Sequence, residues 1–156
     1  MISRWALLFV VALIAVDQAV KRLMLDLVFD PPQIVSVTSF FNLVPVWNRG
    51  ISFGLFGGAE TSRWILVALA LVIVAMLLVW LARSGQGIVR FALLLVIGGA
   101  LSNVIDRVIY GAVIDFIDIH GFGWHWPAFN IADTAIVVGT AMLLYDGLFG
   151  SPRALK

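Results

Sequence analysis

Long apolar runs alternate with short polar stretches along the chain, and four of the runs have the length of a membrane helix. The clearest covers residues 62–83. Its apolar part, 64–82, is uninterrupted and, at about 1.5 Å per residue, reaches roughly 28 Å. Two further runs occupy residues 89–110 and 131–149. We therefore predict three membrane helices in this part of the chain.

The remaining run, residues 4–25, turns charged after an apolar first half. A cleaved signal peptide, with Ala12 and Ala15 as the small residues before the cut, is one interpretation. The continued helical pattern and the three later runs favour a retained membrane helix instead. Asp17 and Lys21 lie four residues apart with the acid first, which favours a helical ion pair. Lys21 is equally suited to snorkel to the membrane surface.

The segment 26–61 interrupts the helical pattern. It begins with Pro31 and Pro32, continues with β-branched and polar residues as far as Trp47, and becomes glycine-rich after Asn48. This order predicts a short interfacial helix followed by a small β-hairpin or sheet at the membrane surface. Because an open sheet edge cannot lie in hydrocarbon, the sheet should rest on the helix ends or line a hydrated cavity.

Composition agrees with a membrane protein. Of 156 residues, 62% are hydrophobic and 12% are charged, with a mean hydropathy of +1.07, whereas a soluble domain is about half apolar and a quarter charged. A net charge of +1 without a basic run gives no sign of a nucleic-acid surface. The absence of cysteine excludes disulfides, thiolate nucleophiles and cysteine metal sites. We predict a single domain, residues 1–156, that is all-α and membrane-embedded apart from its small surface sheet.

The charges favour one orientation. Basic residues divide equally between the two ends of the predicted helices, so the positive-inside count does not decide. Acidic residues, however, concentrate at the end that holds the segment 26–61. On this difference we place both termini in the cytoplasm and the acidic end outside.

Two aspartates mark the ends of a short polar and aromatic hairpin between the third and fourth predicted helices, Asp115 and Asp133. A carboxylate at the end of a membrane helix is costly unless it is paired, hydrated or used for chemistry. Two carboxylates a few ångströms apart share a proton near neutral pH, because both cannot ionise cheaply. The ionised member can take a proton from water while the other donates to a scissile carbonyl. The pair therefore predicts aspartic peptidase chemistry without a metal or cofactor.

Other interpretations of these acids remain open. Asn130 and Asp133 also fit a helix cap, with the carboxylate near the positive end of the helix dipole. Asp118 lies three residues after Asp115 and also near the membrane surface, so it is the main rival to Asp115.

A metal site is the alternative raised by His120 and His125, with one of the two neighbouring aspartates as a further ligand. Their spacing matches no helical HExxH pattern, and a glycine-rich turn lies between them. Beside Trp124 and Trp126, the ordinary role of these histidines is that of polar residues at the membrane interface.

One face of the third predicted helix is polar, because Gly99, Asn103, Asp106, Arg107 and Tyr110 recur at spacings of three and four. This face should point into the bundle, where Asp106 and Arg107 find partners away from lipid. A purely structural polar seam is the alternative for Asp106. Small residues around Gly99 should let a neighbouring helix approach closely.

Taken together, these residues resemble the lipoprotein signal peptidase family, signal peptidase II, over nearly the whole chain. The matching pieces are DQAVK at 17–21, NRGISFG at 48–54, GGALSNVIDR at 98–107, GAVIDF at 111–116 and FNIAD at 129–133. Each piece is weak alone, but all five in this order are highly specific. The resemblance departs at Ser102, where glycine is common, and at Ser52, where alanine is common.

The resemblance implies that the catalytic aspartates are Asp115 and Asp133, which favours Asp115 over Asp118. It also implies two groups of supporting residues. Those expected to hold the substrate backbone or order the dyad are Asn48, Gly50, Asn103, Arg107 and Asn130, and those expected to support the site are Asp17, Lys21 and Asp106.

The family resemblance further implies four transmembrane helices, a small extracytoplasmic β-cradle and a short interfacial helix in the bacterial cytoplasmic membrane. The implied substrate is a prolipoprotein whose lipobox cysteine carries a diacylglyceryl group, cleaved just before that cysteine. Membrane lipids and globomycin-like cyclic peptides are implied partners, no cofactor is implied, and we expect a monomer.

Two functions of other classes compete with the peptidase. A proton-coupled transporter would also use intramembrane Asp, Asn and Arg, but it needs a polar path through both leaflets. In this chain the polar residues gather at one side. A non-enzymatic scaffold would explain the small-residue packing but not the clustered acids.

Overall fold

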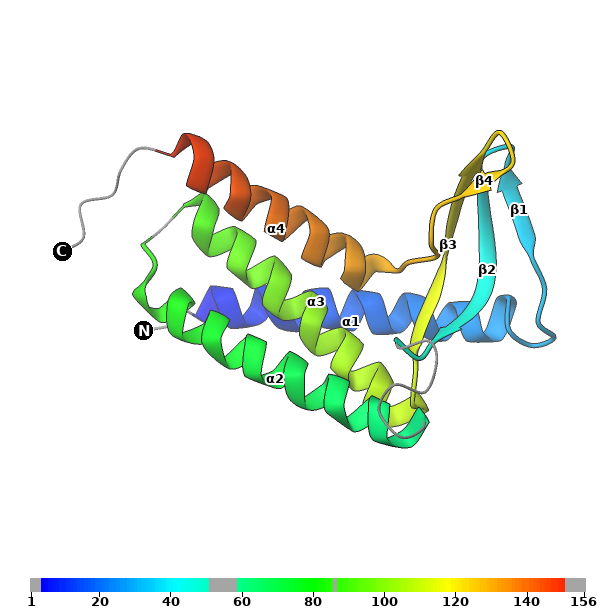
Figure 1. The fold of residues 1–156 in the computed structure, drawn as a ribbon, viewed down its shortest axis with the longest axis horizontal. Helices are drawn as coiled ribbons and strands as arrows, with labels where there is room; N and C mark the ends of the chain where they lie inside the picture. The colour runs from blue at the N-terminus through cyan, green and yellow to red at the C-terminus, as the bar shows by residue number, and fades with distance from the viewer. Residues whose placement is uncertain (1–3, 51–58, 86, 151–156) are drawn as a thin grey trace.

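A computed structural model describes residues 4–50, 59–85 and 87–150. Its helices are α1 (Arg4–Leu27), α2 (Ala59–Arg83), α3 (Ile88–Tyr110) and α4 (Ile131–Phe149). Each helix lies within a few residues of the bounds expected from the apolar runs. Figure 1 shows an elongated bundle with a small sheet at one end, while α1 begins and α4 ends at the opposite end.

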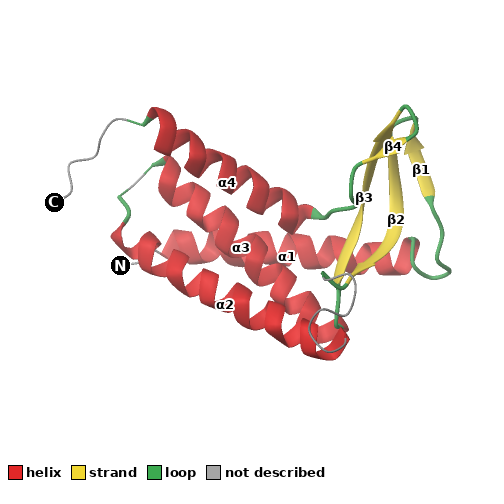
Figure 2. Ribbon diagram, viewed as in Figure 1, coloured by secondary structure: helices red, strands yellow, loops and turns green. Residues whose placement is uncertain are grey.

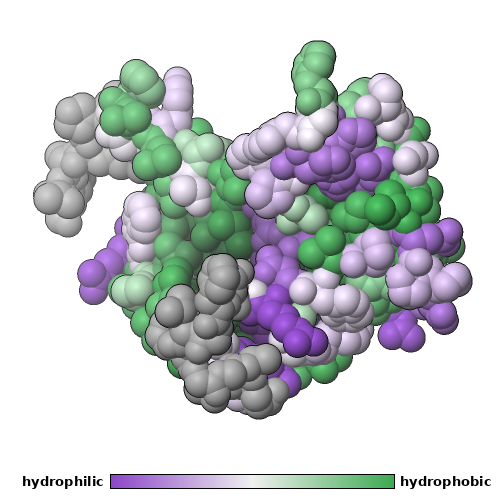
Figure 3. All heavy atoms as spheres, turned by 45° about the vertical axis from the view of Figure 1, so that its right-hand side comes forward, coloured by the Kyte–Doolittle hydropathy of each residue, from purple (hydrophilic) through white to green (hydrophobic). Residues whose placement is uncertain are grey.

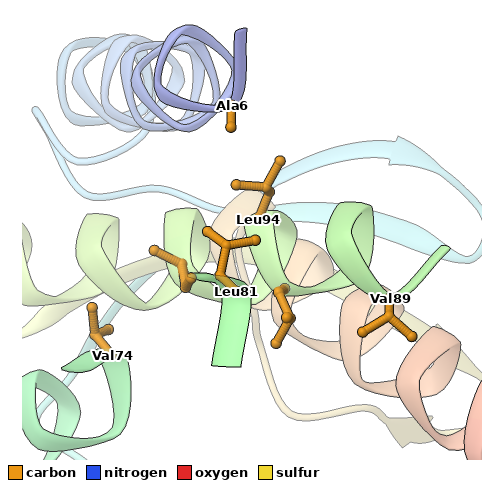
Figure 4. Packing of buried hydrophobic residues seen from close by; sticks show 7 residues of the cluster. Ala6, Val74, Leu81, Val89 and Leu94 are labelled. Carbon is orange, nitrogen blue, oxygen red and sulfur yellow. The ribbon is translucent and has the colours of Figure 1, made fainter. Parts of the chain in front are cut away.

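The helix α3 lies at the centre of the bundle and packs against each of the other three helices. Figure 4 shows Ala6 of α1 pointing toward Leu94 of α3, with Val74 of α2 on another side of the same buried cluster. The outer faces expose large apolar side chains, such as Val72 of α2 and Leu148 of α4. Lipid tails are as apolar as these side chains, so an apolar exterior suits a bundle surrounded by lipid.

Three helices are long and apolar enough to cross a membrane, over Ser62–Arg83, Ile88–Tyr110 and Ile131–Phe149. The chain is therefore a membrane protein. The helix α1 has a similar length, but its second half carries charged residues. Two of them, Asp17 and Lys21, are buried inside the molecule.

Glycines allow α3 to approach two neighbouring helices closely. A Cβ atom on Gly99 would collide with the main-chain oxygen of Ala132 in α4. On Gly98 it would lie 2.6 Å from Leu13 Cδ2 of α1. The close approach predicted around Gly99 is confirmed, and it brings the main chain next to Asp133 against α3.

The sheet has four antiparallel strands in the order β1 (Val35–Thr38), β2 (Phe41–Asn48), β3 (Val113–Gly121) and β4 (Trp124–His125). Figure 2 shows the strands running across the helix axes. The hairpin predicted within 26–61 is β1–β2, and the hairpin predicted before Asp133 is β3–β4. Pairing of β2 with β3 joins them into one sheet and places Val46 opposite Asp115.

The interfacial helix expected in 26–61 is not found in the described part of that segment. Here α1 continues to Leu27, a bridge pairs Phe29 with Pro32, and the chain then enters β1. Two consecutive prolines cannot donate main-chain hydrogen bonds, which explains why a turn and strands follow. Residues 51–58 lie outside the described ranges, and so does Ser52.

Candidate active site

Two different elements deliver the predicted catalytic pair. Gly111, with φ of 78°, ends α3 in the left-handed conformation and directs the chain into β3, which carries Asp115. Glycine suits this position because it has no Cβ to strain the turn. Asp133 lies in the first turn of α4. The hairpin between them brings β3 and the start of α4 to the same end of the bundle (Figure 1).

Asp115 is buried and held by two amides. Its side chain accepts hydrogen bonds from Asn48 Nδ2 at 2.8 Å and from Asn130 Nδ2 at 2.7 Å. Only 1% of the residue is exposed. The Asn48 side-chain oxygen in turn accepts a hydrogen bond from the Gly50 main chain, so the loop after β2 orients this amide toward Asp115.

Asp133 is held by the start of its own helix and by α3. One side-chain oxygen accepts from the Asn130 main-chain N–H, and Asn130 Oδ1 accepts from the Asp133 N–H at 2.8 Å, which forms a capping box. The other oxygen accepts from Asn103 Nδ2 at 2.7 Å. The predicted helix cap is therefore confirmed. It leaves the second oxygen of Asp133 facing the polar face of α3.

Burial of the Asp115 carboxyl raises its pKa, because the charged form is poorly solvated there. Hydrogen bonds from Asn48 and Asn130 and the charge of Lys21 lower this pKa, whereas the nearby Asp133 charge raises it. The balance raises the pKa of Asp115 to about 6 from 3.8. This group therefore holds or releases a proton close to neutral pH, as an acid–base catalyst requires.

A buried ionic cluster lies next to the chain segments that carry Asp115 and Asp133. Lys21 Nζ lies 2.7 Å from Asp17 Oδ2 and 2.7 Å from Asp106 Oδ2, and it donates to Asn103 Oδ1 at 3.1 Å. The predicted pair between Asp17 and Lys21 is confirmed, and Asp106 finds the partner expected for it. Because Asn103 contacts both Lys21 and Asp133, the cluster is connected to the site.

Each carboxylate of this cluster also binds the main chain next to one predicted catalytic residue. Asp17 Oδ1 accepts from the N–H of Ala132, and Asp106 Oδ2 accepts from the N–H of Ile114. These N–H groups belong to the residues immediately before Asp133 and Asp115. The ionic cluster thus fixes the two elements that carry the pair.

Arg107 lies at the edge of the same site. Its Nη1 donates to the Asn103 main-chain oxygen at 3.3 Å, and its buried Nε has no hydrogen-bond partner among the described residues. Gly50 approaches this arginine, since a Cβ there would lie 3.5 Å from Arg107 Nη2. Gly50 has a φ of 79°, which a residue with a side chain rarely adopts. Figure 3, in which the sheet end of the molecule comes forward, shows hydrophilic residues gathered between apolar areas.

Asp118, the rival of Asp115, lies in a different environment. Residues three apart on a strand point to opposite faces. Asp118 accepts a hydrogen bond from Asn42 Nδ2 at 2.9 Å, and His125 Nδ1 lies 2.8 Å from its Oδ1. Burial alone would raise the pKa of Asp118, but the hydrogen bonds from His125 and Asn42 outweigh it and place the pKa below its usual value.

The histidines form part of this second cluster. His120 and His125 face one another across β3 and β4 with their rings stacked at 4.8 Å between centroids. Stacked rings do not converge their nitrogen atoms on a common point. Within the described residues, no group of three or more His, Asp or Glu side chains is placed to hold a metal ion.

The sequence patterns did not indicate two side chains that complete the ionic cluster. Gln18 Nε2 donates to Asp106 Oδ1 at 2.6 Å, and Ser102 Oγ donates to Asp17 Oδ2 at 2.7 Å. A usable signal was present, because Ser102 lies one helical turn before Asp106 and Gln18 lies three residues before Lys21. Asn42, the partner of Asp118, had no such signal within an apolar strand.

Comparison with known proteins shows which family the chain belongs to. The family described as signal peptidase (SPase) II matches residues 9–149. The chain belongs to the signal peptidase II family. The lipoprotein signal peptidase of Methylorubrum extorquens (strain PA1) is 45% identical over 97% of this chain and 90% of its own length. That of Rhodopseudomonas palustris (strain TIE-1) is 44% identical over 96% of this chain and 94% of its own.

Solved structures share the fold of this signal peptidase II member. A bacterial membrane enzyme determined by the in meso method at 1.9 Å resolution is 26% identical, with a TM-score of 0.79 and 94% of both chains covered. Another at 2.3 Å is 27% identical, with a TM-score of 0.75, covering 97% of this chain and 94% of its own. Family membership makes the chain a bacterial membrane peptidase and supports no transporter.

Proposed function

We propose that Asp115 and Asp133 are the catalytic pair with which this peptidase removes signal peptides from prolipoproteins. The observation that carries the assignment is the position of Asn130, which binds a carboxylate oxygen of Asp115 through its side chain and one of Asp133 through its main chain. A single residue thereby orients both acids toward a common site.

The chemistry follows from the shared proton. With its raised pKa, Asp115 is the member that keeps the proton and donates it to the scissile carbonyl oxygen. Asp133, which accepts a hydrogen bond from the Asn103 amide and lies in the first turn of α4, takes a proton from the attacking water. The water oxygen bonds to the carbonyl carbon. As the C–N bond then breaks, Asp133 gives the proton it took from water to the leaving amine nitrogen, and Asp115 recovers its proton from a hydroxyl of the tetrahedral intermediate, which becomes a carboxylic acid.

We propose that the substrate main chain binds beside Asp115, next to the polar residues Asn48, Gly50 and Arg107. The Gly50 N–H holds the Asn48 amide, which donates one hydrogen to Asp115 and has a second one available. The Arg107 Nε–H has no hydrogen-bond partner among the described residues. An extended peptide needs such donors because its carbonyl groups leave water on binding. The names of the relatives support a prolipoprotein substrate. The proposal adds that this substrate carries a diacylglyceryl-modified cysteine and is cut just before it.

The lipid anchor explains a site at the end of a membrane bundle, because the acyl chains can stay at the apolar helix surfaces while the peptide reaches the aspartates. Acyl chains leave one apolar medium for another, so they contribute little net affinity. Specificity then comes from hydrogen bonds to the main chain of the substrate and from the small substrate residues that precede the modified cysteine. Globomycin-like cyclic peptides would inhibit by occupying this same site.

We further propose that α1 is a fourth transmembrane helix, with both termini in the cytoplasm. The buried pairing of Asp17 with Lys21 supports this, because paired and buried charges need not face lipid. The orientation rests on the acidic residues, which gather at the end of the bundle opposite the turn between α2 and α3. The proposed enzyme acts as a monomer with its site at the extracytoplasmic surface.

A gel-shift cleavage assay tests the proposal with purified protein and a diacylglyceryl-modified prolipoprotein. Unlipidated substrate and the variants Asp115→Asn and Asp133→Asn run beside it, and Asp118→Asn is the matched control on the same strand. We expect cleavage of the lipidated substrate alone, lost in both dyad variants and retained in Asp118→Asn. Turnover by either dyad variant would refute the catalytic assignment, and cleavage regardless of lipidation would refute the substrate assignment.

A further inference from the structure

Gln18 of α1 and Ser102 of α3 meet at the buried contact between these helices. Gln18 Nε2 lies 3.1 Å from Ser102 Oγ and 3.3 Å from the Ser102 main-chain oxygen. The serine has no solvent exposure. Each side chain also donates a hydrogen bond to one carboxylate of the ionic cluster. Gln18 donates to Asp106 at 2.6 Å, and Ser102 donates to Asp17 at 2.7 Å.

The charge balance of the ionic cluster explains why these contacts matter. Asp17 and Asp106 supply two negative charges, whereas Lys21 supplies one positive charge to both. All three residues are at most 1% exposed. A buried carboxylate is costly unless hydrogen bonds satisfy its oxygens. Gln18 and Ser102 are the neutral side-chain donors that satisfy them.

We propose that Gln18 and Ser102 are positioning residues for the peptidase reaction. They orient the Asp17 and Asp106 carboxylates, and those carboxylates hold the main chain immediately before each member of the proposed dyad. This proposal rests on the assignment of that dyad, which is made above.

The effect reaches the dyad through Lys21. With Ser102 removed, Asp17 has only Lys21 and one main-chain N–H as donors, so the ammonium moves toward Asp17 and away from Asn103. The Asn103 amide then loses the contact that fixes its orientation toward Asp133. A small misplacement of one reacting group is enough to slow an enzyme strongly.

The test uses two variants that remove a donor with little change in volume, Ser102→Ala and Gln18→Met. Their matched controls lie outside the ionic cluster. Ser84→Ala removes a hydroxyl that binds the Leu81 main-chain oxygen, and Gln33→Met removes an exposed amide. For all four proteins, kcat and KM for the lipidated prolipoprotein are measured across the pH range, together with the thermal unfolding midpoint.

For both test variants we expect kcat to fall about tenfold with KM within about twofold of wild type. We also expect the pH at which kcat declines to be higher in these variants than in wild type. The charged groups that face Asp115 are Lys21 from α1, Arg107 from α3 and Asp133 from α4. Of these, Lys21 is the one displaced, and its charge lowers the pKa of Asp115.

A lower unfolding midpoint with the kcat and pH profile of the controls would mean a merely structural role and would overturn the proposal. If Ser102→Ala does not fold, Gln18→Met decides, because its side chain is only half-buried. Asp115→Asn in the same assay separates the two proposals. Activity in that variant refutes the dyad itself, whereas an inactive Asp115→Asn beside a normal Gln18→Met refutes only the positioning role.

Discussion

Asn130 Nδ2 donates a hydrogen bond to Asp115 Oδ1 at 2.7 Å, although the two residues lie on different elements. The same asparagine caps α4 through its side-chain oxygen, which accepts from the Asp133 N–H. One side chain therefore begins the helix and orients the buried acid. Helix capping and the proposed catalytic role compete as explanations of Asp133 when only the sequence is known, and the contacts of Asn130 are compatible with both.

These two roles of Asn130 can be separated by mutation. Asn130→Ser keeps a good N-cap but removes the amide that binds Asp115, whereas Asn130→Ala removes both. We expect both variants to lose kcat by roughly a hundredfold. Only Asn130→Ala should also lose about 1 kcal/mol of unfolding free energy through the cap. Kinetics and thermal unfolding in detergent measure the two effects, and a serine variant with normal kcat would contradict the orienting role.

The pKa of Asp115 predicts the pH dependence of turnover. If this residue donates its proton to the carbonyl oxygen, the active form has Asp115 protonated and Asp133 ionised. Because the pKa of Asp115 is raised to about 6, kcat/KM should decline as the pH increases above that value. A profile measured with the lipidated substrate checks this. A rate that keeps rising toward pH 8 would reverse the roles of the two aspartates.

The same raised pKa predicts how stability changes with pH. The folded state holds the Asp115 proton up to about pH 6, whereas the unfolded chain releases it near 3.8. The stabilising contribution of protonated Asp115 is therefore present below about 3.8 and is lost as the pH rises through about 6. The side chain in Asp115→Asn cannot ionise. The unfolding midpoint of this variant should therefore rise relative to that of wild type as the pH increases from about 3.8 to about 6. A constant difference across this range would contradict the shift.

Helix packing behind the site gives a further prediction. Gly99→Ala should lower the unfolding free energy by about 2 kcal/mol or more, because its Cβ would collide with the Ala132 main-chain oxygen. It should also lower kcat, since Ala132 precedes Asp133. Gly147→Ala is the matched control in α4, where no atom lies within 4 Å of the new Cβ. That variant should be slightly stabilised, by up to about 1 kcal/mol.

Hydrophobic periodicity predicts the helices well because lipid imposes one strong condition, an apolar run of sufficient length. The same signal cannot show that β2 pairs with β3, since these strands are far apart in the sequence and their pairing depends on tertiary packing. It also misplaces a helix near Pro31 and Pro32, where the chain turns instead.

The site is only partly predictable for a similar reason. Asp17 and Lys21 follow a local helical spacing, and the structure bears out their pairing. Spacing could not choose between Asp115 and Asp118, because that choice depends on which face of a strand meets α3 and α4. The link from Gln18 to Ser102 crosses two helices, so no local pattern contains it.

The contact between Lys21 and Asp106 joins a helix that is made early in synthesis to one that is made later. At about five to twenty residues per second, the ribosome makes the first helix several seconds before the third. During that interval Asp17, one turn away, is the partner that neutralises Lys21. Lys21 therefore exchanges one carboxylate partner for two when the third helix arrives, and the proposed hydrolytic centre is complete only after the fourth helix, which carries Asp133, has followed.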